Sequence, residues 1–179
     1  MNLLWENILK RTSQEDSVAY ILGQNILFKD LSGHERKFVE RIVHERHYRK
    51  GEYIFQQGEV GVGMYIIAKG AVDILVSDPR SPSKNDFVIT KLERLDFFGE
   101  LSLVEDSGRR SAAAIASQDS TLIGFFKPDL MEILERNPRV GTKVVFRLAE
   151  VLGRRLRETT EKISQLKREM IQLQNDRAT

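Results

Sequence analysis

Hydrophobic and polar positions divide this chain of 179 residues into three stretches with different periods. Residues 1–46 carry apolar positions at helical spacing, and residues 128–179 do so again over a much longer run. Between them, residues 47–127 alternate with a period of two and are interrupted by glycine-rich turns, which is typical of short strands. At this length we expect the three stretches to form one domain of mixed α+β class.

The N-terminal stretch predicts three short helices. Ser32 followed by Glu35 matches a capping box, in which the two side chains bond to each other's backbone amides at a helix start. Asp16 or Ser17 can cap the helix before it. The apolar positions expected to face the core are Leu4, Ile8 and Leu9 in the first helix, Val18, Ile21 and Leu22 in the second, and Phe38, Ile42 and Val43 in the third.

The central stretch predicts an all-β unit, either a sandwich or a barrel. Short strand-like runs rich in β-branched and aromatic residues are separated by turn signals at regular intervals. These runs cover residues 53–55, 64–67, 72–76, 87–89 and 122–126. A polar, proline-containing loop over residues 78–86 is expected to form a hairpin tip.

The C-terminal stretch predicts a short helix and a long one. Pro128 suits the first turn of a helix that runs to about Arg136, and Asn137-Pro138 ends it. The next helix, from Val140 to Gln174, would be about 50 Å long, more than a small barrel can cover. Its apolar positions follow a near-heptad spacing with one stutter, and they are Val145, Leu148, Leu152, Leu156, Thr159, Ile163, Leu166, Met170 and Leu173. This seam favours a parallel homodimer, and packing on the chain's own N-terminal helices is the alternative.

Composition narrows the classes of function. The 28 basic and 26 acidic residues leave a net charge of +2, too small to indicate nucleic acid or an anionic membrane as a partner. The chain has no cysteine, which excludes disulfides and thiolate metal sites. It shows neither a secretory leader nor the roughly 18 consecutive apolar residues of a membrane span, so we expect a cytoplasmic protein.

The segment FGELSLVEDSGRRSAAA, residues 98–114, carries side chains suited to a phosphate and a sugar. An arginine can make two parallel hydrogen bonds to a phosphate, and small residues such as Ser111 and Ala112 leave backbone amides open to it. A carboxylate such as Glu100 can accept a hydrogen bond from a ribose hydroxyl, and Gly99 lets the backbone approach the sugar. Buried together, Glu100 and Arg110 would partly neutralise each other when no ligand is bound.

This segment resembles the phosphate-binding cassette of the cyclic nucleotide-binding domain family, and the likeness covers about residues 24–166. The resemblance implies an eight-stranded antiparallel β-roll, or jelly roll, between N-terminal helices and a long C-terminal helix. It implies that Glu100 binds the ribose 2′-hydroxyl, that Arg110 and Ser111 bind the cyclic phosphate, and that the ligand is cAMP, with cGMP as the alternative. The other ligand-binding positions that it implies in the cassette are Gly99, Leu101, Ser102 and Ala112. Arg109 fits a shorter spacing found in kinase regulatory subunits and is the alternative to Arg110.

The resemblance continues into the long helix and also has limits. Thr159 and Thr160 fall where activator-type members carry two hydroxyl residues that contact adenine, one of them from the partner subunit. Leu95 stands where the family usually has glycine, and the connection from Pro138 to Arg154 is about one helical turn longer. The sequence ends at Thr179, without the activator's helix-turn-helix module, so we expect no DNA binding by this chain.

An enzyme is the competing class. A metal enzyme on a similar barrel would need two or three histidines on its strands, whereas His34, His44 and His47 are expected to precede them. The sequence predicts no catalytic, metal or cofactor site. Arg154, Arg155 and Arg157 are expected on a solvated helix face.

The expected function is therefore that of a sensor. Ligand binding would be relayed through the helix at residues 128–136 and the long helix, and a downstream protein would detect it along residues 161–175. A structural dimerisation module with a vestigial pocket is the alternative.

Overall fold

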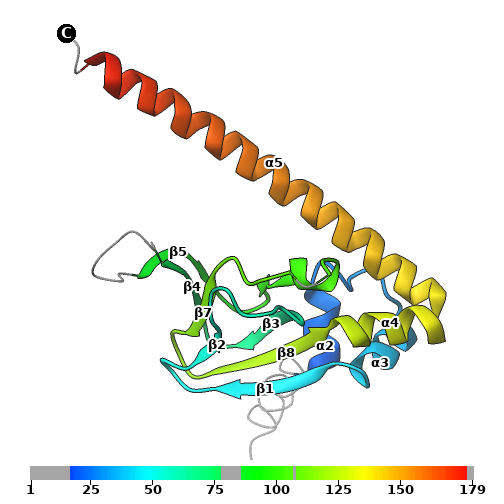
Figure 1. Ribbon diagram of the computed structural model, residues 1–179. Helices are drawn as coiled ribbons and strands as arrows, with labels where there is room; N and C mark the ends of the chain where they lie inside the picture. The colour runs from blue at the N-terminus through cyan, green and yellow to red at the C-terminus, as the bar shows by residue number, and fades with distance from the viewer. Residues whose placement is uncertain (1–16, 78–85, 107, 177–179) are drawn as a thin grey trace, which may run out of the picture.

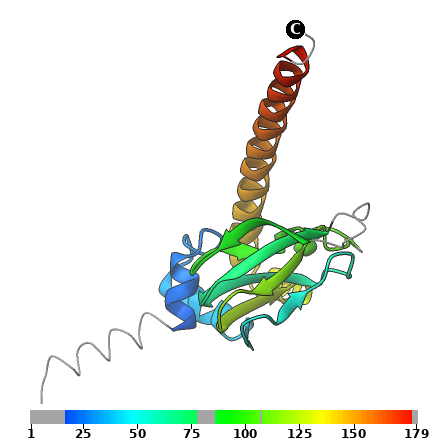
Figure 2. The same cartoon turned by 90° about the vertical axis from the view of Figure 1, so that its left-hand side faces the viewer.

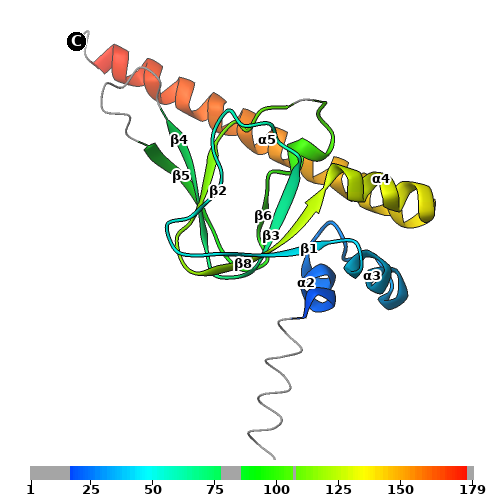
Figure 3. The ribbon, with the colours of Figure 1, turned by 60° about the horizontal axis from the view of Figure 1, so that its bottom comes forward.

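The computed structural model describes residues 17–77, 86–106 and 108–176, so the expected helix with Leu4, Ile8 and Leu9 lies outside the described residues, as does most of the 78–86 loop. Two antiparallel four-stranded sheets, in the orders β1-β8-β3-β6 and β2-β7-β4-β5, form the body (Figure 1). Figure 3 views this body with β4 and β5 on one side and β3 and β6 on the other. The strands are β1 (His44–Tyr48), β2 (Tyr53–Phe55), β3 (Gly63–Lys69), β4 (Val72–Ser77), β5 (Asp86–Leu92), β6 (Phe97–Phe98), β7 (Ala113–Ala116) and β8 (Ser120–Phe126).

Helices occupy one end of this body. α2 (Val18–Gln24) and α3 (Gly33–Glu40) lie at the same end as α4 (Lys127–Arg136), and α5 (Pro138–Asp176) follows directly (Figures 1 and 3). A one-turn 3₁₀ helix, η1 (Glu100–Leu103), follows β6. The eight described strands and the long terminal helix confirm the predicted α+β fold class.

Strand β3 separates two cores and is buried on both faces. Because successive side chains of a strand point to opposite sides, Met64 and Ile66 face the helices whereas Tyr65 and Ile67 face the interior between the sheets. The helix-side core also contains buried residues of α2, α4 and α5. The helices are therefore attached to the back of the sheet whose inner face lines the interior of the roll.

Three of the described strands were not predicted from the sequence pattern. β1 begins at His44, inside the stretch expected to be helical up to residue 46. It is a polar edge strand paired only with β8, and such a strand needs no alternation of apolar residues by which it could be predicted. β7 lies between β2 and β4 and has alanine at three of its four positions, and alanine has little intrinsic strand preference. β6 has only two residues.

The predicted helix starts and breaks are confirmed where the structure describes them. Ser17 caps α2 by accepting a hydrogen bond from the Tyr20 amide, and Ser32 with Glu35 forms the capping box of α3. α3 ends at Glu40, so Ile42 and Val43 follow it instead of lying on its apolar face as predicted. They still pack on the helix-side core.

Helix α5 has two different faces. Over its first four turns Val140, Val144, Leu148 and Val151 are buried in the helix-side core. Leu148 therefore does not belong to the exposed seam, contrary to the prediction. Leu152 is also partly buried against this core. Beyond it the exposed positions Leu156, Thr159, Ile163, Leu166, Met170 and Leu173 keep a regular three-four spacing without a stutter. The C-terminal part of the helix projects away from the body, so its apolar residues do not pack on α2 or α3 (Figures 1 and 2).

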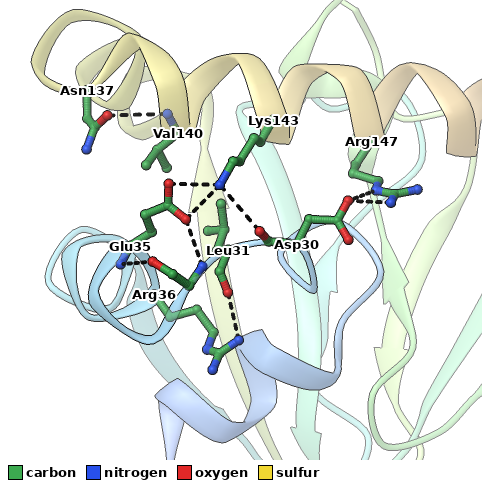
Figure 4. Close-up of polar contacts among 9 residues, drawn as sticks. Asp30, Leu31, Glu35, Arg36, Asn137, Val140, Lys143 and Arg147 are labelled. Carbon is green, nitrogen blue, oxygen red and sulfur yellow. Dashed lines mark hydrogen bonds and ion pairs between the residues drawn. The ribbon is translucent and has the colours of Figure 1, made fainter.

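Salt bridges join α3 and the segment before it to the N-terminal part of α5 (Figure 4). Lys143 Nζ lies 2.8 Å from both carboxylate oxygens of Glu35, whose Oε2 also accepts the Ser32 amide of the capping box. One turn later Arg147 pairs with Asp30, which precedes α3. The contact with Lys143, followed by the hydrogen bond from the Ser32 amide, lowers the pKa of Glu35 to about 2. These pairs thus hold α3 and the segment before it to α5.

Candidate functional site

The cassette turns sharply at Gly99, between β6 and η1. Its φ of 80° lies in the left-handed region, which favours glycine. A Cβ placed there would lie 2.5 Å from Arg110 Nη1. Both the backbone conformation and the approach of Arg110 therefore require glycine at this position.

A cavity of about 440 Å³ lies against this turn, within the range of small-molecule sites. Its walls contain every cassette residue predicted to bind ligand, namely Gly99, Glu100, Leu101, Ser102, Arg110, Ser111 and Ala112. Its apolar lining comes from four strands and consists of Phe55, Ile74, Ile89, Leu92, Phe97 and Phe98. The cavity thus combines a few polar groups with a largely apolar wall.

Arg110 is buried at this cavity and held from several directions. Its Nη1 donates to Ser102 Oγ at 2.9 Å and to the Gly99 carbonyl at 3.2 Å, and Nη2 donates to the Gly63 carbonyl at 2.7 Å. Its Cζ lies 4.0 Å from the centre of the Phe55 ring. Nε is buried and has no hydrogen-bond partner. The Nη groups are thus used for positioning, and the Nε edge keeps a donor for another group.

Burial lowers the pKa of the Arg110 guanidinium, and the negative potential of nearby Glu59 and Glu100 opposes this shift. Arginine nevertheless stays protonated at neutral pH. A desolvated cation with an unused donor favours an anion as its partner, because electrostatic attraction is stronger where water is excluded.

Glu100 has a different partner from the one predicted. Its side chain is 7% exposed, and Oε1 lies 2.6 Å from Nη1 of Arg155 on α5. Arg110 makes its hydrogen bonds elsewhere, so the expected partial neutralisation between Glu100 and Arg110 is limited to the electrostatic attraction that opposes the lowering of the Arg110 pKa. Arg155 also donates to the Phe97 carbonyl at 3.1 Å and lies 4.7 Å from the centre of that ring.

Arg155 is the site residue that the sequence analysis missed. It was grouped with Arg154 and Arg157 on a solvated face, but those two are exposed whereas Arg155 is partly buried. Arg155 follows Val151 by four residues and Leu148 by seven, which places it on the buried stripe of α5. A cation in register with a buried apolar stripe was the available signal.

Thr159 and Thr160 lie on the exposed part of α5 and do not line the cavity of their own chain. Their hydroxyls donate to the carbonyls of Arg155 and Leu156, each at 2.8 Å. Their contact with a base stays a prediction. Arg109 lies at the cavity with Nη1 bonded to the Gly58 carbonyl at 2.7 Å, and its side chain is exposed, unlike that of Arg110.

Two of the histidines lie on a strand, which corrects the expectation that all three precede the barrel. His44 and His47 belong to β1, where His44 Nε2 lies 3.1 Å from Asp129 Oδ1 and His47 Nδ1 lies 3.2 Å from Thr121 Oγ1. In the described part of the chain, no group of three or more histidine, aspartate or glutamate side chains could hold a metal ion. No helix within that same part is long and apolar enough to cross a membrane.

Comparisons with known proteins agree with this geometry. The family model for the cyclic nucleotide-binding domain matches residues 45–137. A cyclic AMP receptor protein from Thermus thermophilus is 33% identical over 132 residues, which cover 74% of this chain and 57% of that protein. A cAMP-dependent protein kinase regulatory subunit from Mycosarcoma maydis is 29% identical over 161 residues, covering 88% of this chain and 28% of that one.

Among solved structures, the catabolite activator protein of Thermus thermophilus matches with a TM-score of 0.70 and 31% identity, over 80% of this chain and 63% of that one. The matched part of the chain spans little more than half the length of the cyclic AMP receptor protein and about a quarter of the length of the kinase regulatory subunit.

Proposed function

Because the chain belongs to the cyclic nucleotide-binding domain family, we propose that it is a sensor that binds cAMP, in preference to cGMP, and relays occupancy through α5. It would act without catalysis, in the cytoplasm. The observation that carries the proposal is Arg110, a buried cation whose Nε faces no partner at the wall of a nucleotide-sized cavity. The relatives named for cAMP favour this nucleotide over cGMP.

In the proposed complex the cyclic phosphate lies against the Arg110 guanidinium and the backbone amides of Ser111 and Ala112. The ribose 2′-hydroxyl donates to the carboxylate of Glu100, whose Oε1 pairs with Arg155. The base lies against the apolar wall from β4 and β5, which includes Ile74 and Leu92. An apolar wall suits a purine, because its flat face is less costly to remove from water than the sugar and phosphate are.

The relay would run through Arg155. This side chain joins Glu100 of the cassette to α5, so a ribose that competes for the carboxylate changes a contact that positions the long helix. A ligand shifts such an equilibrium only by its different affinity for the two arrangements. The Arg155 contact therefore couples the position of α5 directly to ligand binding in the cavity. A downstream protein would then detect α5 along residues 161–175.

We further propose that α5 pairs with α5 of a second copy in a parallel homodimer. Leu156, Ile163, Leu166, Met170 and Leu173 are each about half or more exposed and follow heptad spacing. A helix of 39 residues with such a seam, projecting from its domain, needs an apolar partner. In that dimer Thr160 or Thr159 could reach a nucleotide held by the other copy.

Calorimetric titration of the purified chain with cAMP and with cGMP tests the proposal. We expect micromolar or tighter binding of cAMP and weaker binding of cGMP. Arg110→Ala should lose about 30-fold to several thousand-fold in affinity, since a buried phosphate would be left without its counter-charge. Arg109→Ala is the matched control and should lose only a few-fold, because its side chain is exposed.

A larger loss in Arg109→Ala than in Arg110→Ala would reverse the two roles. If neither nucleotide binds, the sensor proposal fails. The exposed seam of α5 would then favour the alternative, a dimerisation module with a vestigial pocket.

A further inference from the structure

The ring of Phe55 forms a floor under the Arg110 guanidinium. The 4.0 Å between the Arg110 Cζ and the ring centre is shorter than in the other described cation–ring pairs, Arg155 over Phe97 at 4.7 Å and Arg94 over Tyr20 at 5.8 Å. A guanidinium this close to an aromatic face is attracted by the negative potential of the ring, and burial strengthens that attraction.

The hydrogen bonds of Arg110 leave one motion of the guanidinium unrestrained, and this ring restrains it. Ser102, Gly99 and Gly63 all accept from the two Nη atoms and therefore hold one end of the guanidinium. Bonds at one end of a flat group restrain its position but leave it free to tilt about that end. A ring against its face removes the tilt and keeps water from that side. The guanidinium is then held at the wall of the cavity, which Arg110 and Phe55 both line.

The backbone of β2 brings Phe55 to this position. β2 is an edge strand of its sheet, and its register against β7 shifts between Tyr53 and Phe55. Ile54 and Phe55 consequently both pack into the core between the sheets, although consecutive strand residues normally point to opposite faces. The irregularity turns the Phe55 side chain toward the cavity.

Neighbouring aromatic rings then hold Phe55 in place. Its ring centre lies 5.8 Å from that of Phe98 and 6.3 Å from that of Tyr65, and those two rings stack on each other at 5.7 Å. Such contacts fix the ring plane more firmly than an aliphatic pocket would. The guanidinium therefore rests on a ring that is itself restrained.

We propose that Phe55 is a positioning residue for anion recognition. Its ring holds the plane of the Arg110 guanidinium at the cavity wall, in the orientation that meets the cyclic phosphate. The residue acts through Arg110 and touches no reacting group. This inference rests on the proposed function, because it assigns Phe55 a part in the same binding site.

Substitution of the ring by an aliphatic side chain tests the proposal. Phe55→Leu keeps an apolar side chain but removes the aromatic face, and it should weaken cAMP binding about 3- to 30-fold. cGMP binding should weaken by the same factor, because the two ligands share the phosphate. Phe55→Tyr restores a ring and should bind within about twofold of the wild-type chain. Phe28→Leu is the matched control, since Phe28 is a buried aromatic residue that does not line the cavity.

The control separates positioning from stability. We expect Phe28→Leu to lower the melting temperature without changing affinity, and Phe55→Leu to lower affinity beyond any effect on melting. In an Arg110→Gln background, competition at millimolar nucleotide should show no further loss from Phe55→Leu, because the plane it supports is gone.

Wild-type binding with unchanged affinity in Phe55→Leu would overturn the positioning role and leave the proposed function intact. Equal losses in Phe55→Leu and Phe28→Leu would overturn it as well. Absence of binding by the wild-type chain would overturn the proposed function, and this inference with it.

Discussion

Arg155 Nη1 on α5 lies 2.6 Å from Glu100 Oε1 in the cassette, joining the long helix to the wall of the cavity. The Glu100 side chain in this pair is nearly buried, whereas the Arg155 side chain is 42% exposed. A buried carboxylate is costly to leave without a cation, so the position of α5 is energetically linked to the contacts that Glu100 makes. This link makes the proposed relay open to direct measurement.

Removing Arg155 should uncouple the helix from the ligand. The chain has no cysteine, so Lys50→Cys on the body and Lys167→Cys on α5 can carry spin labels without other changes. In labelled protein diluted with unlabelled chain, we expect cAMP to change the label distance. In Arg155→Gln this change should be reduced to less than half.

Arg154→Gln is the control for this experiment, because its exposed side chain precedes Arg155 directly. It should respond to cAMP as the wild type does. A full response in Arg155→Gln would show that α5 senses the ligand by another route.

The Glu35–Lys143 pair should stabilise the domain in a pH-dependent way. Because the pKa of Glu35 is about 2 in the folded chain and 4.5 for a free side chain, the pair contributes fully above about pH 4.5. That contribution is lost as the pH falls from 4.5 toward 2. Glu35→Gln keeps a capping oxygen but removes the charge, and should cost about 1 kcal/mol at pH 7, limited by solvent screening.

Urea unfolding of both proteins at pH 7 and pH 3 measures this difference, which should shrink at the lower pH. Glu132→Gln removes a surface pair with Arg136 and should cost less than about 0.5 kcal/mol. An equal cost for the two substitutions would mean that Glu35 is no more than a surface charge.

Gly99→Ala should damage both stability and binding. The left-handed φ costs about 1 kcal/mol for a side chain, and the new Cβ would push on Arg110 Nη1 from 2.5 Å. We expect a loss of about 1–3 kcal/mol in unfolding free energy and at least tenfold in cAMP affinity. Gly33→Ala, with no atom within 4 Å of its new Cβ, should be neutral in thermal unfolding and calorimetry. Unchanged cAMP affinity in Gly99→Ala would show that Arg110 does not depend on this turn.

Leu148 and Leu156 should respond oppositely to the same substitution. Leu148→Ala leaves a cavity in the helix-side core and should cost about 2–5 kcal/mol in domain stability. Leu156, 69% exposed, should matter only for pairing, and Leu156→Ala should weaken the dimer about tenfold or more, since both copies lose the side chain. Thermal unfolding and sedimentation equilibrium distinguish the two. A destabilised domain with unchanged dimerisation in Leu156→Ala would contradict the proposed seam.

Local signals were predictable from short segments. The caps at Ser17 and Ser32 and the break at Asn137-Pro138 depend on hydrogen bonds and clashes within a few residues, so the sequence specifies them directly. The cassette residues were also predictable, because seven of them occupy one segment that turns around a single cavity. Strands β1 and β7 were not, since their pairing partners and not their own side chains make them strands.

What the sequence determined by itself was thus the helix starts at Ser17 and Ser32, the break at Asn137-Pro138 and the identity of the cassette. Only the tertiary structure decided which partner each charged group has. Glu100 is 55 residues from Arg155 and ten from Arg110, yet it pairs with Arg155 because α5 passes over the cassette. The same packing turns Leu148 inward and leaves Leu156 outside. Periodicity names the positions on a helix that are apolar, but which of them meet a core depends on where the helix docks.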